Sequence, residues 1–245
     1  MSKGIFKILA LFLGMSALVA NEQSSIKDSS YLRLGGVAVY ESLSATRQTD
    51  SKFSTLGYGF SLATGVRNQM ATSNLRLLLA NGKTKGSQSS NKGVVDEAEI
   101  TFGANVASAH MPLYVVLGFR TDKFSAKNRG STPYEHHVSQ LLFGFEGYIP
   151  LQQLKLEYGL NVGNTLTGSL FGDKLSGFRD ISGAYHRFAS GLNSLHVSIG
   201  YSYLLGKRAH YFTRLSGSYF DLKPLYTKHP KTKIVSAKIE IGFGF

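Results

Sequence analysis

The fold of this chain is decided by its last stretch, Lys238-Ile239-Glu240-Ile241-Gly242-Phe243-Gly244-Phe245, in which large apolar residues alternate with charged residues or glycine. A β-strand points successive side chains to opposite faces, so this period of two predicts a strand with one apolar and one polar face. The two faces must then meet different surroundings.

The same alternation recurs about ten times along the chain, with small or polar residues between the apolar ones. The clearest segments are residues 32–40, 56–62, 75–79, 98–106, 113–119, 141–145, 154–162, 195–205, 211–219 and 235–245. Aromatic residues stand near the expected strand ends: Tyr40, Phe119, Tyr148, Tyr158, Tyr203 and Tyr219.

Connections between these segments alternate in length. The long ones are residues 41–53, 82–93, 121–136, 164–192 and 221–233, and the short ones are residues 67–73, 108–111, 149–153 and 206–209. With both termini in the periplasm, an even number of strands places every short turn there and every long loop outside the cell. Ten strands satisfy this parity. Eight or twelve stay open, because residues 164–192 could hold a hairpin around residues 166–171.

The start of the chain has the layout of a secretory signal peptide. Lys3 and Lys7 precede an apolar stretch at residues 8–19, and Ala20 stands before polar Asn21. We therefore expect a cleaved signal peptide over residues 1–20, a periplasmic N-terminal segment over residues 21–30 and a barrel over residues 31–245.

No later segment has the roughly 20 continuous apolar residues of a membrane helix, so a mature chain inside a membrane has to form a closed sheet. A secreted β-sandwich is the alternative, because alternation alone does not distinguish lipid from a protein core. Segments of about nine to eleven residues, aromatic strand ends and a charged opposite face favour lipid. The predicted fold class is all-β, a transmembrane antiparallel up-and-down β-barrel of about ten strands with short periplasmic turns and long extracellular loops.

The final stretch also resembles the C-terminal strand of Gram-negative outer-membrane proteins, in which apolar residues alternate and the last residue is aromatic. This resemblance implies a location in the cell outer membrane. It also implies recognition by the barrel-assembly machinery through Ile239, Ile241, Phe243 and Phe245. The basic, tyrosine-rich composition is similar to that of small epsilonproteobacterial outer-membrane proteins.

Charged residues lie on the face opposite the apolar one. A charge facing lipid costs about 2 to 4 kcal/mol near the midplane, so we expect these side chains to point into the lumen. They are Arg33, Arg76, Glu97, Glu99, Arg120, Glu146, Lys155, Glu157, Arg214, Lys238 and Glu240, with His196 on the same face. The pairs expected from neighbouring strands are Arg76 with Glu97 or Glu99, Glu146 with Lys155, and Arg33 with Glu240. A structural salt-bridge network is favoured, and a narrow hydrophilic channel is the alternative.

The chain carries a formal charge of +12, and 25 basic against 15 acidic residues remain once Lys3 and Lys7 are removed. In an exported protein this excess favours lipid phosphates or other polyanions over nucleic acid. The lysines of the expected outer loops are predicted to contact lipopolysaccharide phosphates or a polyanion. They are Lys83, Lys85, Lys123, Lys127, Lys228 and Lys231.

Catalytic patterns are weak. Ten-stranded outer-membrane barrels include the omptin proteases, which need paired carboxylates and an Asp-His pair to activate water. The candidates lack that arrangement: Asp122, Glu135, His136, His137, Asp173, Asp180 and His186. A lipid-cleaving serine would need a positioned histidine, and His196 with Ser198 is the one candidate. His136 and His137 point to opposite faces of a strand and cannot share a metal. We expect no catalysis, cofactor or metal.

The predicted function is that of a monomeric barrel whose external loops serve surface contact, adhesion or envelope structure, with a possible host surface ligand. A narrow passive channel, slightly anion-preferring if the loop lysines set the potential at its mouth, is the second hypothesis. An omptin-like protease is the third.

Overall fold

The computed structural model describes residues 29–46, 51–85, 90–108, 111–128, 131–151, 154–172, 185–205, 209–226 and 230–245. The predicted signal peptide lies outside these residues. The strands are β1 (Ser29–Thr46), β2 (Ser51–Arg67), β3 (Ala71–Lys85), β4 (Ser90–Asn105), β5 (Leu113–Asn128), β6 (Ser131–Leu151), β7 (Leu154–Gly172), β8 (Tyr185–Arg187), β9 (Gly191–Leu204), β10 (His210–Leu222) and β11 (Lys231–Gly244). The barrel wall begins at Ser29, two residues before the expected boundary.

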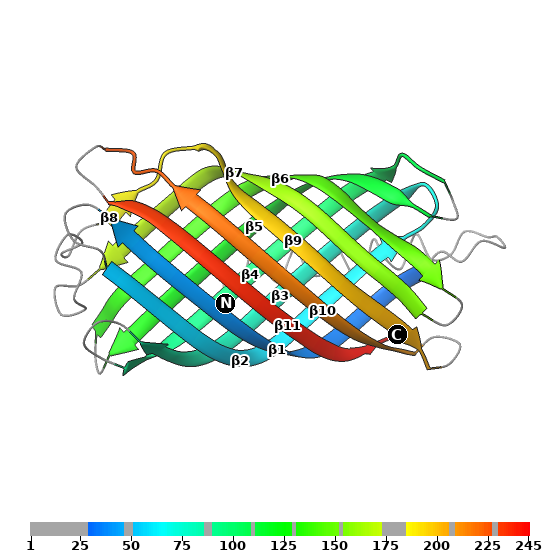
Figure 1. Cartoon of the computed structure of the whole chain (residues 1–245), viewed down its shortest axis with the longest axis horizontal. Helices are drawn as coiled ribbons and strands as arrows, with labels where there is room; N and C mark the ends of the chain where they lie inside the picture. Colours follow the sequence, from blue (N-terminus) through cyan, green and yellow to red (C-terminus); the bar gives the residue numbers. More distant parts are fainter. Residues whose placement is uncertain are drawn as a thin grey trace, which may run out of the picture.

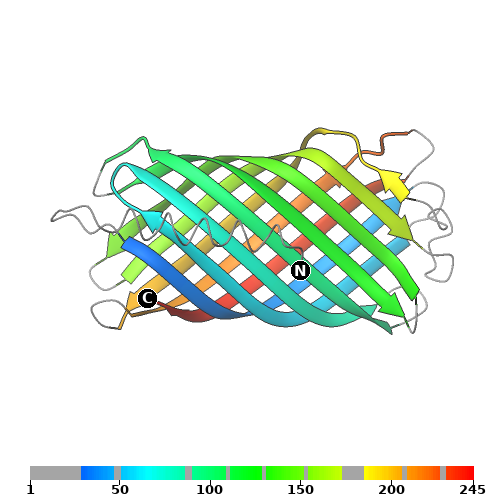
Figure 2. The same cartoon turned by 180° about the vertical axis from the view of Figure 1, so that it is seen from behind.

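Ten long antiparallel strands form a closed barrel (Figure 1). Each long strand pairs with the next along the chain, β11 pairs with β1, and the short β8 adds three residue pairs to the end of β7. The view from behind shows the opposite wall, with its strands also running obliquely to the long axis (Figure 2). The predicted all-β up-and-down barrel is confirmed. In the described part of the chain, no helix is long and apolar enough to cross a membrane.

The barrel has two distinct ends. We call the end at which β1 starts and β11 finishes the terminal end, and the opposite end, with β8, the loop end (Figure 1). At the loop end the strands run further than expected, since β1 and β2 together cover most of residues 41–53. Residues 82–93 and 121–136 are likewise largely strand, and β7 continues through residues 166–171 before β8 pairs back onto it.

The difference has a simple cause. Strand pairing depends on backbone hydrogen bonds, whereas the sequence signal depended on apolar residues at alternate positions. At the loop end the outward residues become polar, so the signal stops while the pairing continues.

Burial along β11 is the reverse of that in a water-soluble barrel. Lys238 and Glu240 are each 3% exposed, whereas Ile239 and Ile241 are each 48% exposed. The other long strands repeat this pattern over their terminal-end portions and give the barrel an outward belt of large apolar residues. Its members include Leu34, Tyr40, Tyr58, Phe60, Leu79, Phe102, Leu117, Phe119, Leu141, Phe143, Leu160, Val197, Ile199, Tyr203, Leu215, Tyr219, Val235 and Phe243.

The closing seam between β1 and β11 depends on glycine. Gly35 lies opposite Gly242, and a Cβ added to Gly242 would lie 2.1 Å from the Leu34 carbonyl oxygen and 2.5 Å from the Gly35 Cα. Both obstacles are backbone atoms, which cannot rotate away. Gly36, one residue along, faces outward and has no atom within 4 Å of such a Cβ.

We expect Gly242→Ala to lower the free energy of unfolding by about 1 to 3 kcal/mol through overpacking, whereas Gly36→Ala should change it by less than about 1 kcal/mol. Urea unfolding in detergent micelles, followed by circular dichroism, measures both. Equal effects of the two substitutions would contradict the close approach at the seam.

Candidate functional site

Inward side chains fill the lumen in three layers. A central charge network comprises Arg76, Glu97, Glu99, Arg120, Asp122, Lys238 and Glu240. A stacked layer of cations and aromatic rings lies toward the terminal end, and an apolar layer lies toward the loop end.

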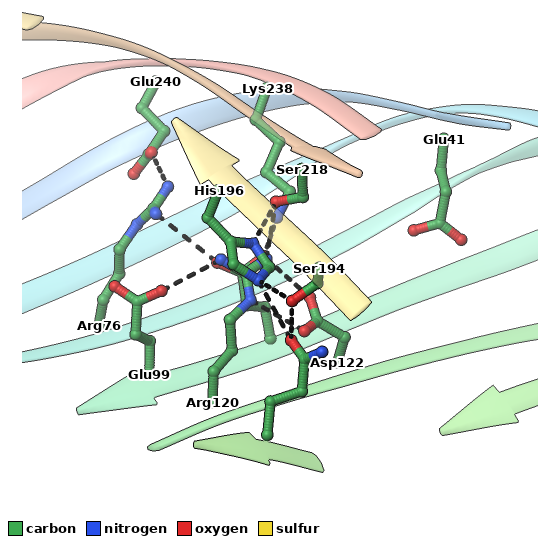
Figure 3. A network of polar contacts seen from close by, with 12 residues as sticks. Glu41, Arg76, Glu99, Arg120, Asp122, Ser194, His196, Ser218, Lys238 and Glu240 are labelled. Atoms are coloured by element: carbon green, nitrogen blue, oxygen red, sulfur yellow. Dashed lines mark hydrogen bonds and ion pairs between the residues drawn. The ribbon is translucent and has the colours of Figure 1, made fainter. Parts of the chain in front are cut away.

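Glu97 is the centre of the charge network, and its cationic partners Arg76, Arg120 and Lys238 are labelled in Figure 3. It forms an ion pair with Lys238 from the far wall, accepts a hydrogen bond from Arg120 at 2.9 Å, and lies 3.6 Å from Arg76. Three cations from three strands therefore meet one carboxylate that is almost completely buried. Their mutual compensation is what makes these charges tolerable away from water.

The two arginines extend the network across the lumen. Arg120 donates to Glu99 at 3.1 Å and to Asp122 at 2.8 Å, and Arg76 pairs with Glu240. Arg76, Glu97 and Arg120 are only 2%, 4% and 3% exposed. A water-filled channel at this level would expose them.

Neutral polar groups continue the network from Arg120 (Figure 3). Ser218 accepts from Arg120 at 3.3 Å and lies 2.9 Å from His196 Nδ1. The other ring nitrogen, Nε2, lies 2.9 Å from Ser194 Oγ and 3.1 Å from Gln140 Oε1. His196 is thus held from both sides.

The stacked layer crosses the lumen from β10 to β7. Arg33 lies between the rings of Phe212 and Tyr31, 5.2 and 5.1 Å from their centroids. Arg67 lies 5.8 Å from both the Tyr31 and Tyr148 centroids. Lys155 completes the stack 4.6 Å from Tyr148. Each such contact is favourable, the more so where water is excluded.

Two carboxylates tie this layer together. Glu157 accepts a hydrogen bond from Arg33 at 2.8 Å and lies 3.8 Å from Arg67, while Glu146 lies 4.0 Å from Arg67. Arg33 also donates to His210 at 3.2 Å. The stacked layer therefore closes the terminal end of the lumen with paired charges.

The apolar layer closes the loop end. It is formed by Val37, Val39, Leu43, Ala45, Leu78, Ala80, Val95, Phe124, Ala126, Val138, Leu170, Phe188, Phe220, Leu222 and Ile234. Phe188 enters the lumen where the chain leaves β8. Its amide donates to the Gly168 carbonyl at 2.9 Å, and the residue bridges to Pro224. Within this layer, Glu41 lies 3.6 Å from His136, whose ring stacks on that of Phe124.

All eleven residues of the predicted lumen network lie on the inward side of the barrel, although several partners differ from those expected. Arg76 meets both Glu97 and Glu240, and Glu240 therefore does not reach Arg33. Glu146 lies near Arg67 instead of Lys155, whose register partner is Pro150. Arg214 donates to Ser198 at 3.1 Å.

Sequence reasoning missed three features. Arg67 was assigned to a turn, although it continues the inward odd-numbered positions of β2. Tyr148 was assigned to an outward aromatic belt, but it stacks inside with Arg67 and Lys155. The apolar layer was not expected at all. In the sequence, its signal is a shift of the apolar residues from the outward positions of a strand to the inward positions, as from outward Tyr40 to inward Leu43 on β1.

The candidates for catalysis are dispersed. Asp122 binds Arg120, Glu135 lies 3.2 Å from Lys123, and His137 lies 2.9 Å from Thr121 Oγ1. Asp173, Asp180 and the His186 side chain lie outside what the structure describes. Ser198 and His196 have different partners. Among the described residues, no group of three or more His, Asp or Glu side chains could hold a metal ion.

The predicted anion-contacting lysines lie mostly on strands instead of loops. Lys83 and Lys85 are on β3, Lys123 and Lys127 on β5, and Lys231 on β11. Lys228 lies outside the described residues. The exposed side chains of Lys83, Lys85, Lys123 and Lys231 are on the outer wall at the loop end.

Neutralising Glu97 should remove the ion-pair partner of Lys238 from a buried site, while Arg76 keeps Glu240 and Arg120 keeps Glu99 and Asp122. We expect Glu97→Gln to lower the free energy of unfolding by about 3 to 5 kcal/mol, and Glu135→Gln, at an exposed ion pair, by less than about 1 kcal/mol. The double variant Glu97→Gln/Lys238→Gln should lose less unfolding free energy than the sum of the losses in the single variants Glu97→Gln and Lys238→Gln. Urea titration of all four variants in detergent measures this, and additive losses would contradict direct pairing of Glu97 with Lys238.

No family model and no curated protein matches this chain. Among solved structures, the autotransporter NalP translocator domain from Neisseria meningitidis covers 98% of this chain and 95% of its own, at 10% identity and TM-score 0.40. The transport unit of the autotransporter AIDA-I from Escherichia coli covers 96% and 97%, at 10% identity and TM-score 0.43. The attachment invasion locus protein Ail of Yersinia pestis covers 89% and 99%, at 12% identity and TM-score 0.34. These similarities concern the barrel fold alone.

Proposed function

We propose that this protein is an integral outer-membrane β-barrel that does not conduct solutes and has no catalytic role. It is a closed scaffold that holds its loop end at the cell surface for contact with the envelope or with other surfaces. The observation that carries the proposal is the filling of the lumen by three layers, each built from side chains of several strands.

Membrane insertion is supported by the reversed burial of the wall. The apolar belt includes residues from every long strand, whereas soluble monomers rarely expose contiguous apolar patches above a few hundred Å². Lipid is the solvent in which such a surface is stable, and a closed barrel leaves no unpaired strand edge within it.

The loop end supplies a second line of support. There the pattern inverts, with Leu43, Phe220 and Ile234 buried inside, and with Ser42, Asp221 and Lys233 on the outer wall. Polar outside and apolar inside is the arrangement expected in water. The loop end of the barrel is therefore proposed to project beyond the lipid.

The closed lumen predicts electrical silence. Purified protein inserted into planar bilayers should show no steady single-channel openings, because charged, stacked and apolar layers block the path in series. An open porin inserted by the same procedure is the positive control. Reproducible openings of the unmodified protein would contradict the closed scaffold and support the channel hypothesis.

The lipid-facing belt is tested by adding charge to it. Ile199, 52% exposed, lies at the middle of the outward face of β9, and Ile199→Arg should cost about 2 to 4 kcal/mol of folding free energy in phospholipid vesicles. Asn81→Arg, on the outer wall at the loop-end edge of the belt beside Tyr58, should cost about 0 to 1 kcal/mol. Equal costs for the two arginines would contradict the proposed position of the membrane.

A further inference from the structure

The outer wall at the loop end of the β3–β4 hairpin carries an unusual arrangement of charge. Lys83 on β3 and Lys92 on β4 are direct register partners, and both side chains are exposed on the outer face. Their Cβ atoms are expected about 5 Å apart, a spacing at which like charges destabilise a strand pair. On β5 the backbone partner of Lys92 is Lys127, and on β3 exposed Lys85 lies two residues beyond Lys83.

Two other lysines at this end, Lys123 and Lys231, have carboxylate partners. Lys123 lies 3.2 Å from Glu135, and Lys231 lies 3.3 Å from Asp221. Within the described residues, no carboxylate lies within ion-pair distance of Lys83, Lys85 or Lys92. The outward carboxylate of this hairpin, Asp96, is the register partner of Leu79 and Lys123, so it lies away from Lys83, Lys85 and Lys92, whose positive charges stay uncompensated.

The position of the lysine row Lys83, Lys85 and Lys92 relative to the apolar belt indicates which kind of anion it could bind. Lys83 has Lys92 on one side and Leu56, an exposed member of the apolar wall, as its register partner on β2. On its own strand, exposed Leu79 lies four residues away on the same face, about 13 Å along the strand and less in height because barrel strands are tilted by about 40°. Lysine stems can also lie along apolar surface while their ammonium groups reach polar partners. In the proposed membrane position, the row lies at the level of lipid head groups.

We propose that Lys83, Lys85 and Lys92 form a binding site for the phosphate groups of the phosphorylated glycolipid of the outer leaflet. The ammonium groups bind the phosphate oxygens through charge-assisted hydrogen bonds, and the acyl chains lie against the apolar belt below, beside Leu56 and Leu79. The bound anion relieves the repulsion between Lys83 and Lys92. The site rests on the proposed membrane location but not on whether the lumen conducts.

The test compares two variants of equal charge change. Lys83→Gln/Lys92→Gln removes the directly opposed pair, and Lys123→Gln/Lys231→Gln removes two lysines that have carboxylate partners. Binding of diphosphoryl lipid A and of the same lipid enzymatically stripped of phosphate is titrated in detergent micelles by native mass spectrometry. Heat-modifiable migration on gels establishes that each variant is folded.

Wild-type protein should prefer the phosphorylated lipid, and Lys83→Gln/Lys92→Gln should weaken that binding roughly 30-fold, as expected for two lysines at a membrane surface. The control pair should weaken it less than about threefold. The proposal is overturned if both lipids bind equally, if the control pair loses as much affinity, or if heparin binds the row while lipid A does not. The last result would assign the row to a soluble polyanion. Conductance and the Ile199→Arg measurement are independent of these outcomes.

Discussion

The compensation of buried charge around Glu97 is the interaction on which the rest of this structure depends. A closed sheet offers each strand two faces, and the described charged residues of the terminal-end half lie on the inside. A lumen this narrow holds little water, so inward charges have to satisfy one another. Lys238, Arg120 and Arg76 do this by reaching one carboxylate from different walls. The barrel is therefore held across its diameter as well as around its circumference.

The change in the wall from the terminal end to the loop end follows from the same constraint. Along one strand the outward residue changes from Tyr40 to Ser42 and Ser44, and the inward residue changes from Arg33 to Leu43 and Ala45. In the proposed membrane position, one continuous sheet is thus surrounded by lipid along one part and by water at the loop end. Where the wall faces apolar surroundings the core is charged, and where it faces polar surroundings the core is apolar, so the hydrophobic effect stabilises both halves with opposite patterns.

The class of fold and the inward side of the charges could be predicted from sequence because both follow from a period of two. The partners that charged side chains find across the lumen could not be predicted in this way. Register reasoning finds neighbours on adjacent strands, as it did for Arg76 with Glu97, whereas Arg33 reaches Glu157 on a non-adjacent strand through its long side chain. Apolar alternation also ended before the strands did, so Lys83 and Lys123 were assigned to loops that are in fact continuations of the wall.

A filled lumen moves any recognition by this molecule to its outer wall and loop end. On that wall charge is distributed unevenly, because Glu135 and Asp221 compensate lysines on β5 and β11 while, among the described residues, Lys83, Lys85 and Lys92 of the β3–β4 hairpin have no carboxylate within ion-pair distance. Directly opposed lysines on a rigid strand pair cannot separate as they could on a loop, so their repulsion persists until an anion binds between them. In the proposed site, rigid strands thus turn a general excess of positive charge into a local preference for phosphate at the edge of the lipid.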